Sequence, residues 1–255
     1  MPTPEVWFSG FLLLVAMPAA AVGGVLLVRR TVGPETLARH NDVAGFIYAV
    51  IGVVYAVLLG FTAIIVWEQF RHAQEIVEAE ANALADLYRD AQVFPPEVRD
   101  AVGEQLRAYA RLVVEKEWPA MAAGKSSPET WEAYNEIWRT YHEFKPQDEH
   151  QRVWYAESVS RMNFLGDQRR SRLLGVRSSV PGIMWMVLLG AGAVAIGFCL
   201  FFGTKSTWAH SLMTAGLAIT IGLVLLSILA LEHPFSGITR VDSEAFEQAL
   251  RILGE

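Results

Sequence analysis

Apolar residues concentrate in four long runs, each close to the length that crosses a bilayer. About 20 apolar residues span a hydrocarbon core about 30 Å thick. None of the runs has an Asp, Glu, Lys or Arg in its interior, as expected where an unpaired charge would be costly. They cover residues 7–28, 43–67, 181–203 and 207–231. We therefore predict four membrane-spanning helices.

The first run could be mistaken for a secretory signal, because it contains the small residues 18–21. It lacks a basic segment before the apolar residues and carries Arg29 and Arg30 after them, so we predict a span rather than a cleaved signal. Tryptophans stand near the ends of the runs, as interfacial anchors do: Trp7, Trp67, Trp185 and Trp208.

Residues 68–180 form a polar region without any run long enough to span, holding 15 Lys and Arg and 19 Asp and Glu. Prolines and a glycine–serine stretch divide it into four pieces with apolar residues at helical spacing, at 68–93, 97–117, 128–143 and 148–177. No stop signal separates Trp67 from Glu68, so the second span should continue into the first piece. Residues 172–181 should likewise lead a helix into the third span.

The predicted fold class is therefore all-α: a four-span helical membrane protein with a soluble helical domain inserted between spans 2 and 3. Its parts are 1–67 with spans 1 and 2, 68–180 with four soluble helices continuous with the spans, 181–231 with spans 3 and 4, and 232–255 as a short tail. Eight arginines near the membrane ends of the domain side, against three arginines and one lysine opposite, place the soluble domain and both termini in the cytoplasm.

The second span carries small residues three or four apart, which form one narrow face: Gly45, Ala49, Gly52, Ala56 and Gly60. Such a face either packs closely on another helix of the protomer or lines a constriction. Tyr48, Tyr55 and Thr62 recur every seven residues, and their hydroxyls either bond a neighbouring helix or line a wet path. If the span lines a pore, the residues expected there are Gly45, Tyr48, Gly52, Tyr55, Ala56, Leu59 and Thr62.

Polar residues stand at both ends of this span. Asn41 and Asp42 begin the helix, where they serve either as N-caps or as the mouth of an ion path. Glu68 and Glu75 share a face beyond the other end, with Glu78 and Glu80 nearby. That face is either simply solvated or an acidic vestibule.

A basic group precedes the third span: Arg169, Arg170, Arg172 and Arg177. Arginines at this position contact anionic lipid headgroups or set topology, and a phosphate-bearing regulator is the alternative. After the fourth span, Glu232 is expected to pair with His233 or a nearby arginine.

Composition agrees with a membrane protein: 53% of the 255 residues are hydrophobic, 19% are charged, and the mean hydropathy is +0.28. The net charge of −6 argues against a nucleic-acid partner. The single cysteine, Cys199, excludes an intrachain disulfide, and the six histidines show no helical metal spacing. No phosphate-binding loop, nucleophile elbow or zinc-protease motif occurs, so we expect no enzyme activity, no cofactor and no metal.

Several motifs resemble the bestrophin-like family of membrane proteins, over about residues 8–250. They are Asn41-Asp42-Val43-Ala44-Gly45, Tyr55-Ala56-Val57-Leu58-Leu59-Gly60-Phe61, Trp67-Glu68, Leu87-Tyr88-Arg89-Asp90, Asn163 with Arg170 and Arg172, and Pro234-Phe235-Ser236-Gly237 followed by Val241. The resemblance implies a pentameric ion channel with four spans, cytoplasmic termini and a pore lined by the second span. The acidic residues Asp242, Glu244 and Glu247 after the fourth span do not form a recognisable calcium clasp like that of bestrophins, so calcium gating is not expected.

Two functional hypotheses follow. The first is a homo-oligomeric ion channel of the bacterial inner membrane, for which the family resemblance implies a pentamer. Its partners are the lipid bilayer, other copies of itself and inorganic ions. The second is a membrane-anchored sensory or scaffold protein, whose soluble helices bind a partner without transport.

Overall fold

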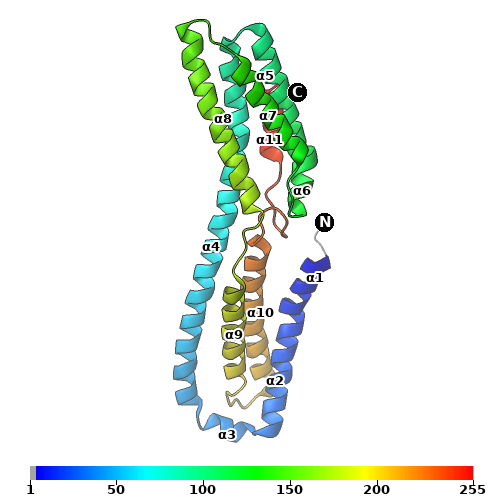
Figure 1. Ribbon diagram of the computed structural model, residues 1–255. Helices are drawn as coiled ribbons and strands as arrows, with labels where there is room; N and C mark the ends of the chain where they lie inside the picture. Colours follow the sequence, from blue (N-terminus) through cyan, green and yellow to red (C-terminus); the bar gives the residue numbers. More distant parts are fainter. Residues whose placement is uncertain (1–3, 255) are drawn as a thin grey trace. The chain divides into compact units, whose positions relative to one another are not determined.

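The computed structural model describes residues 4–254, with the side chains of residues 8–33 and 35–254, so the side chain of the predicted anchor Trp7 lies outside the described residues. All regular elements in this range are helices, which confirms the predicted all-α class (Figure 1). Four of them are long and apolar enough to cross a membrane: Phe8–Thr31, Asn41–Val93, Gly182–Cys199 and Thr207–Leu231. The four predicted spans are therefore confirmed.

The chain forms two compact units. The membrane unit comprises Met1–Glu68 and Ser179–Glu232, and the polar unit comprises Gln69–Ser178 and His233–Glu255. One helix, α4 (Asn41–Asp90), contributes to both without interruption, as predicted from the absence of a stop signal at Trp67. Residues 232–255 are not a separate tail, because from His233 onward they belong to the polar unit.

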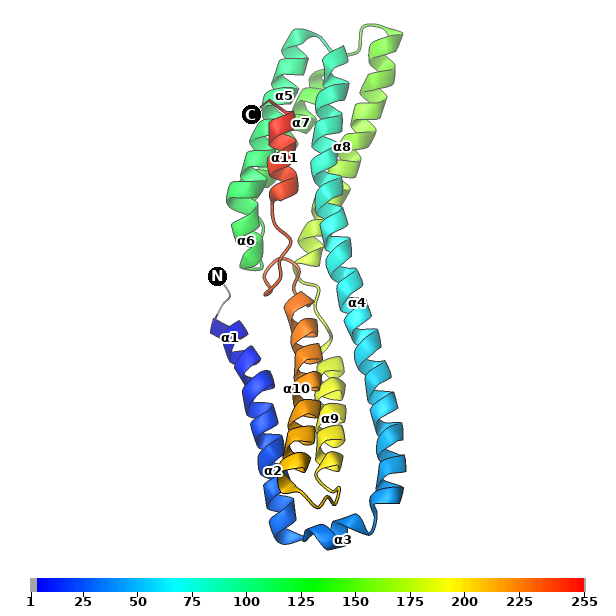
Figure 2. The same cartoon turned by 180° about the vertical axis from the view of Figure 1, so that it is seen from behind.

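The membrane unit contains α1 (Pro4–Phe11), α2 (Met17–Thr31), the short α3 (Pro34–Ala38), the first half of α4, α9 (Gly182–Cys199) and α10 (Thr207–Leu231). A π-helical turn, Leu12–Ala16, joins α1 to α2. In Figures 1 and 2, α10 lies between α2 and α9. Close approach depends on Gly222, because a Cβ there would lie 2.6 Å from the carbonyl oxygen of Leu13.

The two loops of the membrane unit are bonded to each other. Asn41 Nδ2 donates to the carbonyl oxygen of Gly203 at 2.7 Å, and the Gly203 N–H donates back to Asn41 Oδ1 at 2.9 Å. Arg29 donates to the side-chain and backbone oxygens of Thr204, both at 2.9 Å. The segments after α2 and α9 therefore lie at the same end of the unit.

The polar unit is built from the second half of α4, α5 (Pro96–Leu112), α6 (Trp118–Ala122), α7 (Pro128–Glu143), α8 (Glu149–Gly175) and α11 (Glu244–Ile252). A 3₁₀ turn, Ala91–Val93, follows α4, and a π-helical turn, Val113–Glu117, joins α5 to α6. Side-chain caps begin two helices, since Ser127 accepts from Thr130 N at 3.2 Å and Asp148 from Gln151 N at 2.8 Å.

One predicted helix junction is wrong. Helix α8 ends at Gly175, and α9 begins only at Gly182, with Pro181 as its N-cap residue. Proline lacks an N–H and disfavours helical backbone at the residue before it, so the helix stops ahead of Pro181.

Candidate functional site

One side of α4 is buried within the membrane unit. Tyr55, Leu59, Thr62 and Val66 are at most 7% exposed and pack with residues of α9 and α10, among them Leu188 and Leu225. The Thr62 hydroxyl donates to the carbonyl oxygen of Leu58 in its own helix at 2.9 Å. Tyr55, Leu59 and Thr62 were predicted to line a path, but their burial within a single protomer leaves them unavailable for it.

Tyr48 shares this packed side. Its ring stacks on Phe198 at a centroid distance of 6.1 Å and meets Phe202 edge-on at 5.5 Å. The seven-residue repeat of hydroxyl residues is thus explained by packing against neighbouring helices, which was one of the two predicted uses.

The small-residue face of α4 has no such neighbours. A Cβ added at Gly45, Gly52 or Gly60 would meet no atom within 4 Å outside the helix's own backbone. Ala49 and Ala56 are exposed. Glycine in a helix interior lowers helix stability by about 1 kcal/mol relative to alanine. Close packing within the protomer does not explain why glycine occupies these positions despite that cost.

Large apolar residues occupy the side of α4 opposite the buried one. With about 100° between successive residues, Val53, Val57 and Ile64 lie roughly across the helix from Tyr55, Thr62 and Val66. Their exposed fractions are 64%, 51% and 56%. Each turn of α4 thus has a buried side, an open flank of small residues and an open apolar side.

The polar residues at the start of α4 have different surroundings. The amide of Asn41 is engaged with both backbone groups of Gly203, so it fastens two loops rather than capping its own helix. Asp42 is exposed. Of the two, Asp42 alone retains a side chain directed to open space.

Beyond the membrane unit, Glu75 is exposed and forms surface ion pairs with Arg71 at 3.6 Å and, when the imidazole is protonated, His72 at 3.7 Å. Glu68 is also exposed. Glu80 is fully buried, so the prediction that it belongs to a solvated face is wrong.

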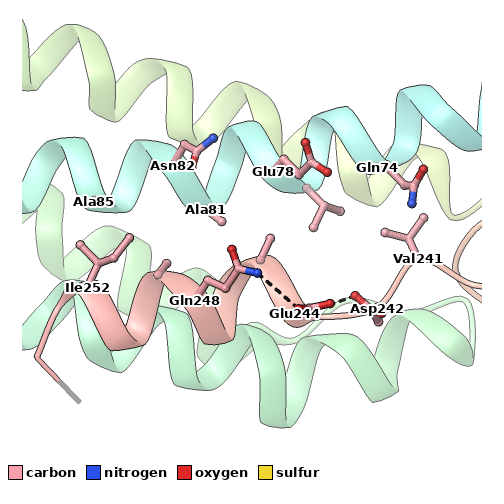
Figure 3. Close-up of a pocket in the computed structure, with 13 residues that line it drawn as sticks. Gln74, Glu78, Ala81, Asn82, Ala85, Val241, Asp242, Glu244, Gln248 and Ile252 are labelled. Atoms are coloured by element: carbon pink, nitrogen blue, oxygen red, sulfur yellow. Dashed lines mark hydrogen bonds between the residues drawn. The ribbon is translucent and has the colours of Figure 1, made fainter.

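A polar groove separates α4 from the segment that carries α11 (Figure 3). Its volume is about 360 Å³, and α4 contributes Gln74, Glu78 and Asn82 to its wall. The opposite wall holds Asp242 and Glu244, and Gln248 donates to Glu244 Oε1 at 3.3 Å. The groove is acidic, since three carboxylates and no cationic side chain line it.

The polar unit is organised around a buried network of two arginines and two glutamates. Arg172 donates to both oxygens of Glu80 at 2.7 and 2.9 Å and to Glu117 Oε2 at 2.8 Å. Arg169 pairs with the same Glu117 at 2.5 Å, and Tyr109 donates to Glu80 Oε1 at 2.6 Å. The charges balance, as burial of ionised groups requires.

Aromatic rings enclose the two guanidinium groups. Arg172 lies over Trp118 at 5.4 Å and Phe246 at 5.6 Å, and Arg169 lies over Trp131 at 5.3 Å. Burial lowers the pKa of Arg172, but Glu80 and the other anionic partners outweigh it, so the net pKa is raised. Burial, and then the Glu80 charge, raise the pKa of Tyr109 well above its usual value.

The predicted basic group therefore divides into two pairs. Arg169 and Arg172 are buried and ion-paired, which contradicts their predicted contact with lipid headgroups. Arg170 and Arg177 are exposed. Glu232 also differs from expectation, because it accepts hydrogen bonds from Val180 N at 3.2 Å and Trp185 Nε1 at 3.1 Å.

Among the side chains that the structure describes, no group of three or more from His, Cys, Asp and Glu is arranged to hold a metal ion. His210 is buried in α10, and its Nε2 lies 3.0 Å from the carbonyl oxygen of Cys199. This histidine therefore serves the packing of α9 and α10.

Comparison with known proteins gives one family and one fold. The model of the Bestrophin-like domain matches residues 15–246. A bacterial bestrophin homologue from Klebsiella pneumoniae is 16% identical, with a TM-score of 0.66 and coverage of 94% of this chain and 96% of its own. A membrane protein of solved structure is 15% identical, with a TM-score of 0.70 and coverage of 94% and 97%. Curated protein sequences give no match.

Proposed function

This chain belongs to the bestrophin-like family, and we propose that it is a homo-oligomeric ion channel whose pore is lined by α4. Family membership supports channel activity, and the fold shared with the bestrophin homologue supports the same layout of spans. The observation that carries the role of α4 is its open flank. Glycines at 45, 52 and 60 share one flank of α4 and have nothing beside them within the protomer, so a second copy could approach this flank closely.

A ring of protomers assigns a use to each side of α4. The buried side faces the protomer's own α9 and α10, so the opposite side faces the ring axis. Val53, Val57 and Ile64 then narrow the path as an apolar constriction, while Gly45, Gly52 and Ala56 lie on the flank toward the neighbouring α4. Tyr48, Tyr55, Leu59 and Thr62 support the lining helix from behind.

Asp42 is proposed as the acidic mouth of the path, and Glu68 and Glu75 as a vestibule at its other end. All three are exposed, and closed symmetry would multiply each into a ring of charge. Five copies are proposed on family grounds. The membrane is the bacterial inner membrane, with the polar unit and both termini in the cytoplasm, supported by the excess of arginines on that side.

The test is ion flux into sealed vesicles, with oligomer content measured on the same sample. Gly52→Leu adds a large side chain to the open flank of α4. We expect it to disrupt contact between neighbouring α4 helices and to reduce both flux and assembly, by about 1 to 3 kcal/mol in assembly if soluble cores are a guide. Gly23→Leu is the matched control, since Gly23 also lies within a span and has open space around its Cβ.

Two results would overturn the proposal. Wild-type vesicles without flux, from correctly assembled protein, would favour the membrane-anchored scaffold. Full flux and full assembly in Gly52→Leu would mean that this flank meets neither the path nor a neighbour. Asp42→Asn is a separate test, because the charge selectivity of the flux should change in this variant only if Asp42 forms an acidic mouth.

Orientation is tested by labelling a single cysteine. Lys145 is a suitable position, because it lies exposed between α7 and α8. Lys145→Cys in a Cys199→Ser background should resist an impermeant thiol reagent in intact cells and react after lysis. Reaction in intact cells would place the polar unit outside.

A further inference from the structure

A second pocket of the polar unit has the opposite charge to the α4–α11 groove. It lies between the turn that follows α6 and the end of α8, and its volume is about 640 Å³. Three cations and no carboxylate are among its lining residues, which are Gly124, Lys125, Ser126, Arg170, Leu173, Leu174, Val176 and Arg177. We call it the basic pocket.

Local backbone chemistry fixes Lys125 beside α8. Gly124 has a φ of +72°, a left-handed conformation that favours glycine, and ends α6 in a Schellman motif. In this motif Lys125 N donates to Ala120 O and Gly124 N donates to Met121 O, both at 2.9 Å. The turn thus presents Lys125 to α8 although 45 residues separate it from Arg170 in the sequence.

The cations of the basic pocket are available to a ligand. Within the part of the chain that the structure describes, no ion pair engages Lys125 or Arg177, and both are exposed. Arg170 pairs with Asp167, one turn earlier on α8, but both side chains are about 60% exposed. Such an exposed pair contributes little, so an incoming anion can replace it.

One wall of the pocket is apolar. This wall consists of Leu173, Leu174 and Val176. Leu174 is 73% exposed. A soluble anion gains nothing from that wall. A phospholipid does, because its phosphate meets the cations while its glycerol and upper acyl carbons cover leucine and valine.

The chain itself keeps this pocket near the bilayer. Arg177 precedes Gly182, the first residue of the α9 span, by five residues. An extended chain covers at most about 3.6 Å per residue, so Arg177 lies within about 18 Å of the start of that span. Lipid headgroups are therefore within reach of the pocket.

We propose that the basic pocket binds the phosphate of an anionic phospholipid, with Lys125, Arg170 and Arg177 as the phosphate ligands and Leu174 against the lipid's apolar part. The site does not depend on ion conduction. It would tie the end of α8 to the membrane surface next to the third span.

The test is native mass spectrometry of the full chain in detergent with phosphatidylglycerol or phosphatidylcholine added at equal concentration. Each cation at a membrane surface contributes about a fivefold factor toward anionic lipid. Lys125→Gln with Arg170→Gln and Arg177→Gln should therefore lower the preference for phosphatidylglycerol up to about 100-fold at low salt, and Lys125→Gln alone about fivefold. The matched control replaces three exposed arginines outside the pocket, Arg99, Arg139 and Arg152, with Gln and should keep the preference.

Leu174→Gln and excess inorganic phosphate separate the sources of the phosphate group. We expect Leu174→Gln to weaken lipid binding and inorganic phosphate to compete poorly. Unchanged preference in the triple variant would overturn the site. Full displacement by inorganic phosphate, with no effect of Leu174→Gln, would overturn the lipid and leave a soluble phosphate ligand.

Discussion

Arg172 has no contact with solvent, and its value to the fold depends entirely on its partners. Removal of one partner from a buried ion pair leaves an uncompensated charge and costs about 3–5 kcal/mol. We therefore expect Arg172→Met to lower the free energy of unfolding by about that amount, because Glu80 and Glu117 lose a shared donor. Thermal unfolding of the purified protein in detergent measures this loss.

Arg139→Met is the control for that substitution. Arg139 forms ion pairs with Glu132 and Glu136 that remain about half exposed, and pairs of this kind contribute about 0–1 kcal/mol. Equal losses in the free energy of unfolding of the two variants would mean that the buried network stabilises the polar unit no more than a surface ion pair does.

Tyr109 should make stability depend on alkaline pH. Its raised pKa means that folded protein keeps the phenolic proton when unfolded protein, with a tyrosine pKa near 10, releases it. The free energy of unfolding therefore falls as pH rises above about 10. Tyr109→Phe should make this decline shallower, and it should cost about 1–3 kcal/mol at neutral pH because Glu80 loses a donor.

Denaturant unfolding from about pH 9 to 12 checks the effect of Tyr109. Burial raises the pKa of Tyr141 to about 12, so that residue contributes to the slope in both proteins. The difference between the two slopes isolates Tyr109, and parallel slopes would contradict the expectation.

The roles of single charged residues were the least predictable from sequence. Arg169 and Arg172 stand beside a span like headgroup-binding arginines, but their partners Glu80 and Glu117 lie 52 to 92 residues away. Lys125 was missed because the arginines that share the basic pocket with it are also distant in the sequence. Tertiary packing of the helices decides which charges are buried or grouped, and local residue spacing does not predict that packing.

At the scale of elements, the sequence predicts most of the helices. Pro96, Pro128 and the serine and aspartate caps mark starts that the structure places within about two residues of the predicted ones. The continuous α4 follows from the absence of any breaker near Trp67. The separation of α8 from α9 was missed because Pro181 was read as part of an apolar span rather than as a stop.

Helix α11 should be an integral part of the polar unit. Phe246 is fully buried and meets Trp118 edge-on at 5.9 Å. Phe246→Ala should lower the free energy of unfolding by about 3–5 kcal/mol. Ile252→Ala on the same helix should cost less than about 0.5 kcal/mol, since Ile252 is exposed. Thermal unfolding compares them, and similar losses would count against a packed α11.

The bond between the loops of the membrane unit is a second element-scale test. Asn41→Ala removes two hydrogen bonds to Gly203, each contributing about 0.5–1.5 kcal/mol. We expect the thermal midpoint to fall by several degrees. Asp42→Ala, at an exposed neighbouring position, should leave it nearly unchanged. A fall in Asp42→Ala as large as in Asn41→Ala would argue that the loop bond adds nothing.

At the scale of the whole molecule, we predict a closed cyclic homo-oligomer. With four candidate spans among its described residues, one protomer has too few helices to enclose a water-filled path by itself. Native mass spectrometry in mild detergent should show one assembly larger than a dimer. A monomer across several added lipids would remove the channel proposal.

Fold class and family could both be predicted from the sequence, because apolar runs and short motifs are local. The lining of a path could not, since Gly52 and Tyr55 occupy the same helix within three residues and have different surroundings. The hydroxyl repeat looked suited to a wet path but packs against α9. Only tertiary contacts separate the buried side of α4 from its open ones.

The assembly of the polar unit from two chain segments also sets an order during protein synthesis. Of the two segments of the polar unit, residues 69–178 are synthesised before the third and fourth spans, and α11 is synthesised only after them. Until Phe246 arrives, the rings and guanidinium that it covers lack their last neighbour. A chain cut after Ser236 would insert every span yet leave apolar surface open to chaperones and proteases. The polar unit can therefore close only after α11 has been translated.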